Sequence, residues 1–137
     1  MSGEENKRIV RRWFEDGINK QDLSRIRDIL SSDFVAHDRM SQPTSLDDYL
    51  KYSRASFAAF PDNAATIDDM IAEGDRVVAR GFITGTHRGQ FQGFAPTQRQ
   101  FKVGFLEEFR VKDGKISDVW MQMDRLGMMQ QLGVAPR

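Results

Sequence analysis

The chain has 137 residues, with 20 Lys and Arg against 20 Asp and Glu, so its formal net charge at pH 7 is zero. This length suits a single domain over residues 1–137 with one core, and the charge balance provides no basic field for nucleic acid or anionic lipid. The chain has no cysteine, which excludes a disulfide framework and a thiolate metal site or nucleophile. No apolar run approaches the ~20 residues that cross a bilayer. The N-terminus is charged rather than signal-like, so we expect a cytoplasmic protein.

Three helices are predicted in the first half of the chain. Ser2 and Glu5 have the spacing of a capping box, and apolar residues recur after them at helical intervals to about residue 19. Asp22 is expected to cap a short second helix. A third helix begins with Ser45 as its cap and ends before Pro61, which cannot continue a helix.

Strands are predicted in the second half. Residues 65–72 and 76–86 flank a Gly-Asp turn, and residues 101–112 and 115–123 flank an Asp-Gly turn, which is a strong hairpin signal. Residues 85–99 are rich in glycine and are expected to form a loop. Helices followed by strands predict an α+β domain, in which helices cover one face of a curved, mostly antiparallel sheet.

Strict alternation in the last strand predicts which side chains share a face. One face would carry Ile116, Asp118, Trp120, Gln122 and Asp124, so the Asp124 carboxylate would lie beside an indole and an amide. The opposite face would carry Ser117, Val119, Met121 and Met123. On this pattern Met121 and Met123 suit the outer face of the sheet or a subunit contact.

Several motifs in this order are similar to one known family. They are FVAHD (34–38), AAFPD (58–62), GTHRG (85–89), DGKI (113–116) and W-x-x-x-D (120–124) followed by QQLG (130–133). Together they resemble the SnoaL-like polyketide cyclases, which have the cone-shaped NTF2-like fold. The resemblance implies an acid/base enzyme without cofactor or metal that closes a ring in a bulky apolar or aromatic carbonyl compound by an intramolecular aldol reaction. It also implies a homodimer or a higher homo-oligomer.

The resemblance places the general acid/base at Asp124 and a cavity-lining histidine at His37. Burial would raise the pKa of Asp124 and a nearby cation, for which Arg80 is the candidate, would lower it, so the net direction stays open. Asp124 has two structural alternatives, an ion pair with Arg80 and a cap for residues 125–131. Glu107 is a second pocket carboxylate if its strand face turns inward. His37 is the second catalytic candidate, because it could orient or protonate a substrate oxygen. Arg80 is expected to bind substrate from an interior-facing position of its strand, where it alternates with Val77 and Ala79. The remaining expected substrate-binding residues are Trp13, Tyr49, Phe57, Phe82, Phe105, Trp120 and Gln122.

Other activities of the fold stay open as alternatives. Asp38 is placed like the base of ketosteroid isomerases, although Trp13 stands where those enzymes have a tyrosine. Epoxide hydrolases of this fold pair an arginine with an aspartate two residues along its strand, which here is Phe82. A hydroxylase, a dehydratase and a non-catalytic ligand-binding module remain. His87 is expected to stabilise its loop or a subunit contact rather than to act in catalysis, and two histidines fifty residues apart give little support for a metal site.

Overall fold

The structure, a computed structural model, describes residues 2–37 and 42–136. Helices precede most of the strands along the chain, and α1 continues directly into a π-helical turn, η1. The helical segments are α1 (Gly3–Arg12), η1 (Trp13–Ile18), α2 (Leu23–Ile29), α3 (Leu46–Ala59) and α4 (Arg125–Gln131). The strands are β1 (Leu30–His37), β2 (Thr44–Ser45), β3 (Ala64–Glu73), β4 (Arg76–Thr86), β5 (Gln100–Lys112) and β6 (Lys115–Met123). The predicted α+β class is confirmed.

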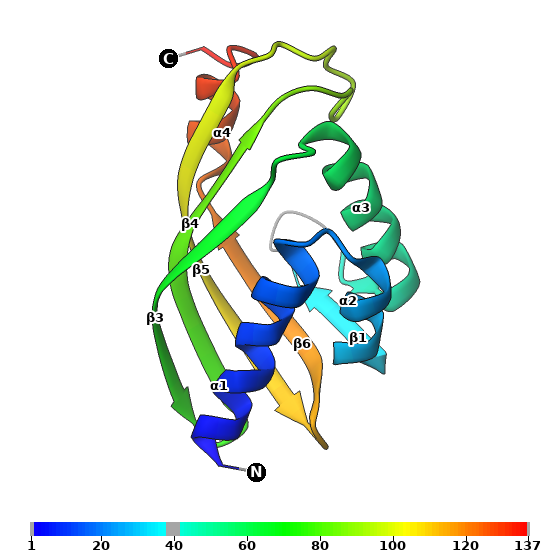
Figure 1. The fold of residues 1–137 in the computed structure, drawn as a ribbon, viewed down its shortest axis with the longest axis vertical. Helices are drawn as coiled ribbons and strands as arrows, with labels where there is room; N and C mark the ends of the chain where they lie inside the picture. Colours follow the sequence, from blue (N-terminus) through cyan, green and yellow to red (C-terminus); the bar gives the residue numbers. More distant parts are fainter. Residues whose placement is uncertain (1, 38–41, 137) are drawn as a thin grey trace.

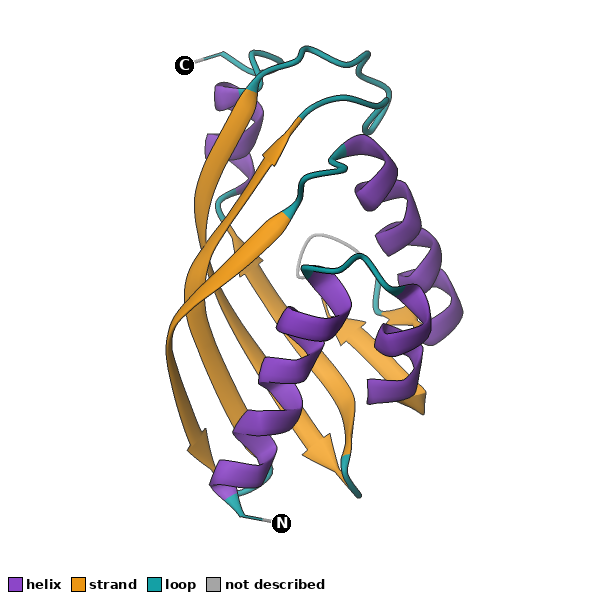
Figure 2. Cartoon of the chain, viewed as in Figure 1, coloured by secondary structure: helices purple, strands orange, loops and turns teal. Residues whose placement is uncertain are grey.

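The strands form a curved, unclosed sheet in the order β2-β1-β6-β5-β4-β3 (Figure 1). Every neighbouring pair is antiparallel except β1 and β6, which run parallel. Figure 2 shows α1, α2 and α3 on one side of the sheet. We call the face that these helices cover the inner face and the opposite one the outer face. The short α4 packs against β5 near the end where that strand begins.

The predicted helix caps form as expected. The Ser2 hydroxyl and the Asp22 carboxylate accept hydrogen bonds from backbone N–H groups in the first turns of α1 and α2, and Ser45 does the same for α3. These bonds satisfy donors that the start of a helix leaves without a partner. Pro61 follows the end of α3 at Ala59. None of the helices in the described ranges is long and apolar enough to span a membrane.

The end of the first predicted helix differs from the expected α-helix, because residues Trp13–Ile18 form η1. Short π-helical segments are rare and often lie at functional sites. Trp13 and Phe14, adjacent in the chain, are both buried here. Gly17 permits the close approach of α2, since a Cβ at this position would lie 2.7 Å from Cγ1 of Ile26.

A bulge in β6 decides which side chains of this strand face inward. Val111 of β5 pairs with Ile116, but Arg110 pairs with Asp118, so Ser117 is an extra residue. An extra residue reverses the alternation of faces along a strand. Ile116 therefore faces the core, as does Val119 three residues later. The predicted sharing of one face by Ile116 and Asp118 is wrong for this reason.

Candidate active site

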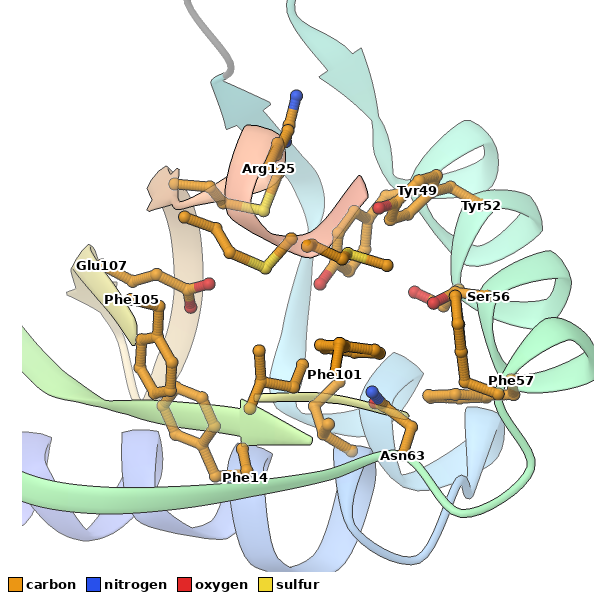
Figure 3. A pocket seen from close by; sticks show the side chains of 18 of the residues that line it. Phe14, Tyr49, Tyr52, Ser56, Phe57, Asn63, Phe101, Phe105, Glu107 and Arg125 are labelled. Carbon is orange, nitrogen blue, oxygen red and sulfur yellow. The ribbon is translucent and has the colours of Figure 1, made fainter. Parts of the chain in front are cut away.

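A cavity lies between the inner face of the sheet and the helical segments η1, α3 and α4 (Figure 3). Its volume is about 110 Å³, and its wall is mostly aromatic and aliphatic. The apolar side chains of the wall are Trp13, Phe14, Ile18, Phe57, Phe60, Ala65, Ile83, Phe91, Phe101, Phe105, Met121, Met123 and Met128. The polar ones are Tyr49, Tyr52, Ser53, Ser56, Asn63, Glu107 and Arg125. An apolar wall with a few polar groups is typical of small-molecule sites.

Glu107 brings a carboxyl group into this apolar surrounding. It lies on β5 between Phe105 and Phe109, on the inner face, and Figure 3 shows its carboxyl group directed into the cavity. Its Oε2 atom is buried and has no hydrogen-bond partner among the described residues. Burial raises the pKa of Glu107 to about 8, because the apolar surrounding disfavours the charged form. Glu107 is therefore mostly protonated at pH 7.

Tyr49 projects into the cavity from α3, on the side opposite the sheet (Figure 3). The residue is 5% exposed, and its ring stacks on Trp13 with centroids 6.5 Å apart and packs against Phe34 at 5.2 Å. Burial, and then the charge of Glu107, raise the pKa of Tyr49 well above its usual value, while a hydrogen bond with Ser53 lowers it. The phenol is neutral at any physiological pH.

Five predicted substrate-binding residues line the cavity. They come from three segments, η1, α3 and β5, and three of them add aromatic side chains to the two polar groups already described. The five are Trp13, Tyr49, Phe57, Phe105 and Glu107. The indole Nε1 of Trp13 is buried and, like Oε2 of Glu107, has no hydrogen-bond partner among the described residues. Two buried polar atoms without partners in one cavity wall are what a bound ligand would satisfy.

His37 and Trp120 lie on the outer face, not in the cavity. They are neighbours in the register of β1 and β6, and their rings stack with centroids 4.8 Å apart and an interplanar angle of 7°. Nε2 of His37 lies 3.0 Å from Oδ2 of Asp118. The guanidinium of Arg76 covers the Trp120 ring at 4.7 Å. This arrangement corrects the expected cavity position of both residues. The bulge at Ser117 turns Trp120 outward, and His37 faces outward because it alternates along β1 with the buried Phe34 and Ala36.

Arg80, Phe82 and Gln122 also lie on the outer face. Arg80 and Gln122 border a shallow depression there, and the Phe82 ring lies under Nζ of Lys102 at 4.1 Å. Arg80 alternates along β4 with Val77 and Ala79; these two residues are buried, so the face with Arg80 is the outer one. The expectation of an interior arginine is therefore corrected.

Asp124 is the N-cap of α4 and is exposed. Its Oδ1 atom accepts a hydrogen bond of 2.8 Å from the backbone N–H of Gly127. A Cβ at Gly127 would lie 2.3 Å from Oδ2 of Asp124, so only glycine fits beside the cap. The expected cavity position of this carboxylate is corrected, and the structural alternative of a cap for residues 125–131 is what the structure shows.

Sequence reasoning missed much of the cavity wall. Met121 and Met123 were expected to face outward, but they line the cavity because of the bulge at Ser117. A usable signal was present, because a face containing Val119, Met121 and Met123 matches the apolar inner face of β5 better than the face containing Asp118.

Asp38, the alternative base, lies outside the described residues. His87 stabilises its loop as expected, because its backbone N–H and its Nδ1 atom both bond across residues 97–99.

Residues 8–132 match the model of the SnoaL-like polyketide cyclases. The chain belongs to this family. Members of the family are typically polyketide cyclases, and the predicted NTF2-like fold is confirmed by the solved structures that resemble this one. No curated protein is significantly similar to the chain.

Two solved structures from Streptomyces are each 31% identical in sequence. AclR from Streptomyces galilaeus, a proposed hydroxylase, aligns over 99% of this chain and 89% of its own, with a TM-score of 0.90. IdmH from Streptomyces antibioticus, a proposed polyketide cyclase, aligns over 94% of this chain and 99% of its own, with a TM-score of 0.81. A proposed SnoaL-like cyclase from Jannaschia sp. CCS1 is 23% identical over 98% and 95% of the two chains, with a TM-score of 0.89, which shows the fold alone.

Proposed function

We propose that this protein is a cofactor-independent acid/base enzyme of the polyketide cyclase type, and that Glu107 is its catalytic acid/base. In its ionised form, which is the minor one at pH 7, Glu107 takes a proton from the carbon next to a substrate carbonyl, which breaks a C–H bond and leaves an enolate. The enolate carbon attacks a second carbonyl of the same molecule and forms the new C–C bond. The protonated Glu107 then returns its proton to the resulting alkoxide. The sum is an isomerisation, so no oxidant or reductant is needed.

One observation carries this proposal: a carboxyl group lies in an apolar cavity, and within residues 2–37 and 42–136 it forms no ion pair. A carboxylate whose pKa is about 8 is a stronger base than an ordinary one, which suits it to a weakly acidic C–H group. The neighbouring Glu108 shows the contrast, because it lies on the outer face and is paired with Arg76.

The wall of the cavity indicates an apolar, aromatic-rich carbonyl substrate. The cavity of about 110 Å³ is smaller than the several hundred Å³ of a typical ligand site. A substrate larger than one ring therefore requires side chains of the wall to move. Met121, Met123 and Met128 can do so at low cost, since methionine is unbranched and adapts its shape.

The test is turnover of β-keto ester polyketide analogues by Glu107→Gln. We expect kcat to fall by about 10²–10⁴-fold, the usual contribution of general acid/base catalysis, with a much smaller change in KM. Glu108→Gln is the matched control, because it makes the same change one residue away on the opposite face, and it should retain activity. Wild-type kcat in Glu107→Gln would refute the assignment. Binding of apolar carbonyl compounds without turnover by the wild type would favour the non-catalytic alternative.

A hydroxylase is the second candidate, because AclR, a proposed hydroxylase, is 31% identical and superposes with a TM-score of 0.90. Such a reaction converts a C–H group and O₂ to C–OH and water, and it requires a two-electron donor besides the protein. Incorporation of ¹⁸O from ¹⁸O₂ into the product distinguishes it from ring closure, which takes up no oxygen.

A further inference from the structure

We propose that Tyr49 is a second catalytic residue, whose hydroxyl donates a hydrogen bond to the reacting carbonyl oxygen while Glu107 handles the proton on carbon. This inference rests on the proposed function and names the group that would stabilise the enolate. The geometry behind it is that Tyr49 and Glu107 enter one cavity from opposite sides, from α3 and from β5 (Figure 3).

The Tyr49 ring is held in place rather than free to turn away. Trp13 stacks on it with an interplanar angle of 25°, and Phe34 packs against it at 5.2 Å. Only 5% of the residue is exposed, whereas Tyr52, which also borders the cavity, is 45% exposed. A donor fixed in advance needs no rearrangement as charge develops on the substrate, and this is the basis of oxyanion stabilisation.

The Tyr49 hydroxyl can donate a hydrogen bond to a ligand. A phenol has one proton to donate and also accepts hydrogen bonds, and the same holds for the serine hydroxyl. Ser53, one turn further along α3, is a hydrogen-bond partner of the Tyr49 side chain and also lines the cavity. When Ser53 donates in that bond, the proton of Tyr49 is left for an oxygen atom placed in the cavity.

The roles of the two residues are complementary. When the Glu107 carboxylate removes the proton from carbon, the electron pair of the C–H bond moves toward the carbonyl oxygen, and the hydrogen bond from Tyr49 strengthens as negative charge grows there. Tyr49 keeps its proton throughout, because its pKa lies well above the usual phenol value. Loss of one such donor typically costs about 10²–10³-fold in kcat.

The first experiment measures binding and needs no substrate. Acetophenone carries a carbonyl oxygen on one aromatic ring, and cumene has nearly the same shape without that oxygen. We expect Tyr49→Phe to weaken acetophenone binding by about 3–10-fold, the value of one hydrogen bond, and to leave cumene binding unchanged. Tyr52→Phe is the matched comparison. It should change the affinity for acetophenone less than Tyr49→Phe does, because Tyr52 is more exposed and its hydroxyl can hydrogen-bond to water. If the ratio of the affinity for acetophenone to the affinity for cumene is the same in Tyr49→Phe as in the wild type, the proposal is overturned.

Two further measurements separate this proposal from the assignment of Glu107. The chain has two tyrosines, so their ¹³Cζ NMR signals are readily assigned in the wild type. Acetophenone should shift the Tyr49 signal of the wild-type protein, and cumene should not. This result does not depend on whether Glu107→Gln is active or on whether Tyr49→Phe folds. An identical response of the Tyr49 signal to the two compounds would contradict the donor role. With a turned-over substrate, Tyr49→Phe should lower kcat more than it raises KM, and the reverse would show a binding role alone.

Discussion

Glu107 of β5 and Met121 of β6 lie directly opposite each other in the antiparallel register, and both line the cavity. The side chain next to the buried carboxyl is thus a thioether, a weak hydrogen-bond acceptor with no proton to donate. This pairing helps to explain why burial alone sets the pKa of Glu107, since burial is the cause of its rise to about 8. It also offers a direct way to change that pKa.

Met121→Gln should lower the pKa of Glu107 from about 8. The new amide can donate a hydrogen bond to the carboxylate, which favours the charged form. Met121→Leu keeps the site apolar and is the control, for which we expect little change. A carboxyl ¹³C NMR titration of Glu107 measures both variants, and a Gln variant that titrates like the wild type would show that the two side chains do not interact.

Glu107 should make the folded protein less stable as the pH rises. Below its ordinary pKa of 4.5 the group is protonated in both the folded and the unfolded chain, so it has no effect. Between pH 4.5 and about 8 the unfolded chain loses this proton while the folded chain retains it, and the free energy of unfolding falls by a few kcal/mol. Urea denaturation across this pH range should show a fall in the free energy of unfolding for the wild type and for Glu108→Gln, and no such fall for Glu107→Gln. The same slope in Glu107→Gln and wild type would mean that the carboxyl is hydrated.

Asp124→Ala should cost about 1 kcal/mol of stability, because it removes the N-cap of α4. Asp124→Asn should retain most of that stability, since asparagine caps helices as well as aspartate does. Thermal denaturation measures both changes. The Asn variant also separates the two candidate acid/base residues: if it lowers kcat by 10²-fold or more while Glu107→Gln does not, the catalytic role belongs to Asp124.

His87→Ala should destabilise the protein by about 2–3 kcal/mol and loosen residues 87–99. His87 is fully buried, and its Nδ1 atom accepts a hydrogen bond from the half-buried backbone N–H of Thr97, a bond that the variant removes. His37→Ala, at the half-buried outer-face histidine, is the control and should cost less. Faster amide hydrogen exchange at residues 97–99 in His87→Ala, and not in His37→Ala, is the expected signature; equal exchange in the two variants would contradict it.

Local signals in the sequence determined most of the secondary structure. The caps at Ser2, Asp22 and Ser45, the stop at Pro61 and the Asp-Gly turn at residues 113–114 each act through neighbouring backbone groups. Such interactions need no distant partner, which is why they are readable in order along the chain. The motifs resembling the family likewise predicted the NTF2-like fold, which the comparisons confirm.

The tertiary structure alone decided which residues meet in the cavity. One extra residue at Ser117 turns Met121 inward and Trp120 outward, in a strand that pairs with β5 on one side and with β1 on the other. Asp124 lies outside, where it caps α4, and Glu107 is the cavity-lining residue with a carboxyl group in the part of the chain that the structure describes. Alternation along a strand is a local pattern, but its phase is set by pairing with strands distant in the sequence, so the composition of the site could not be derived from the chain by itself.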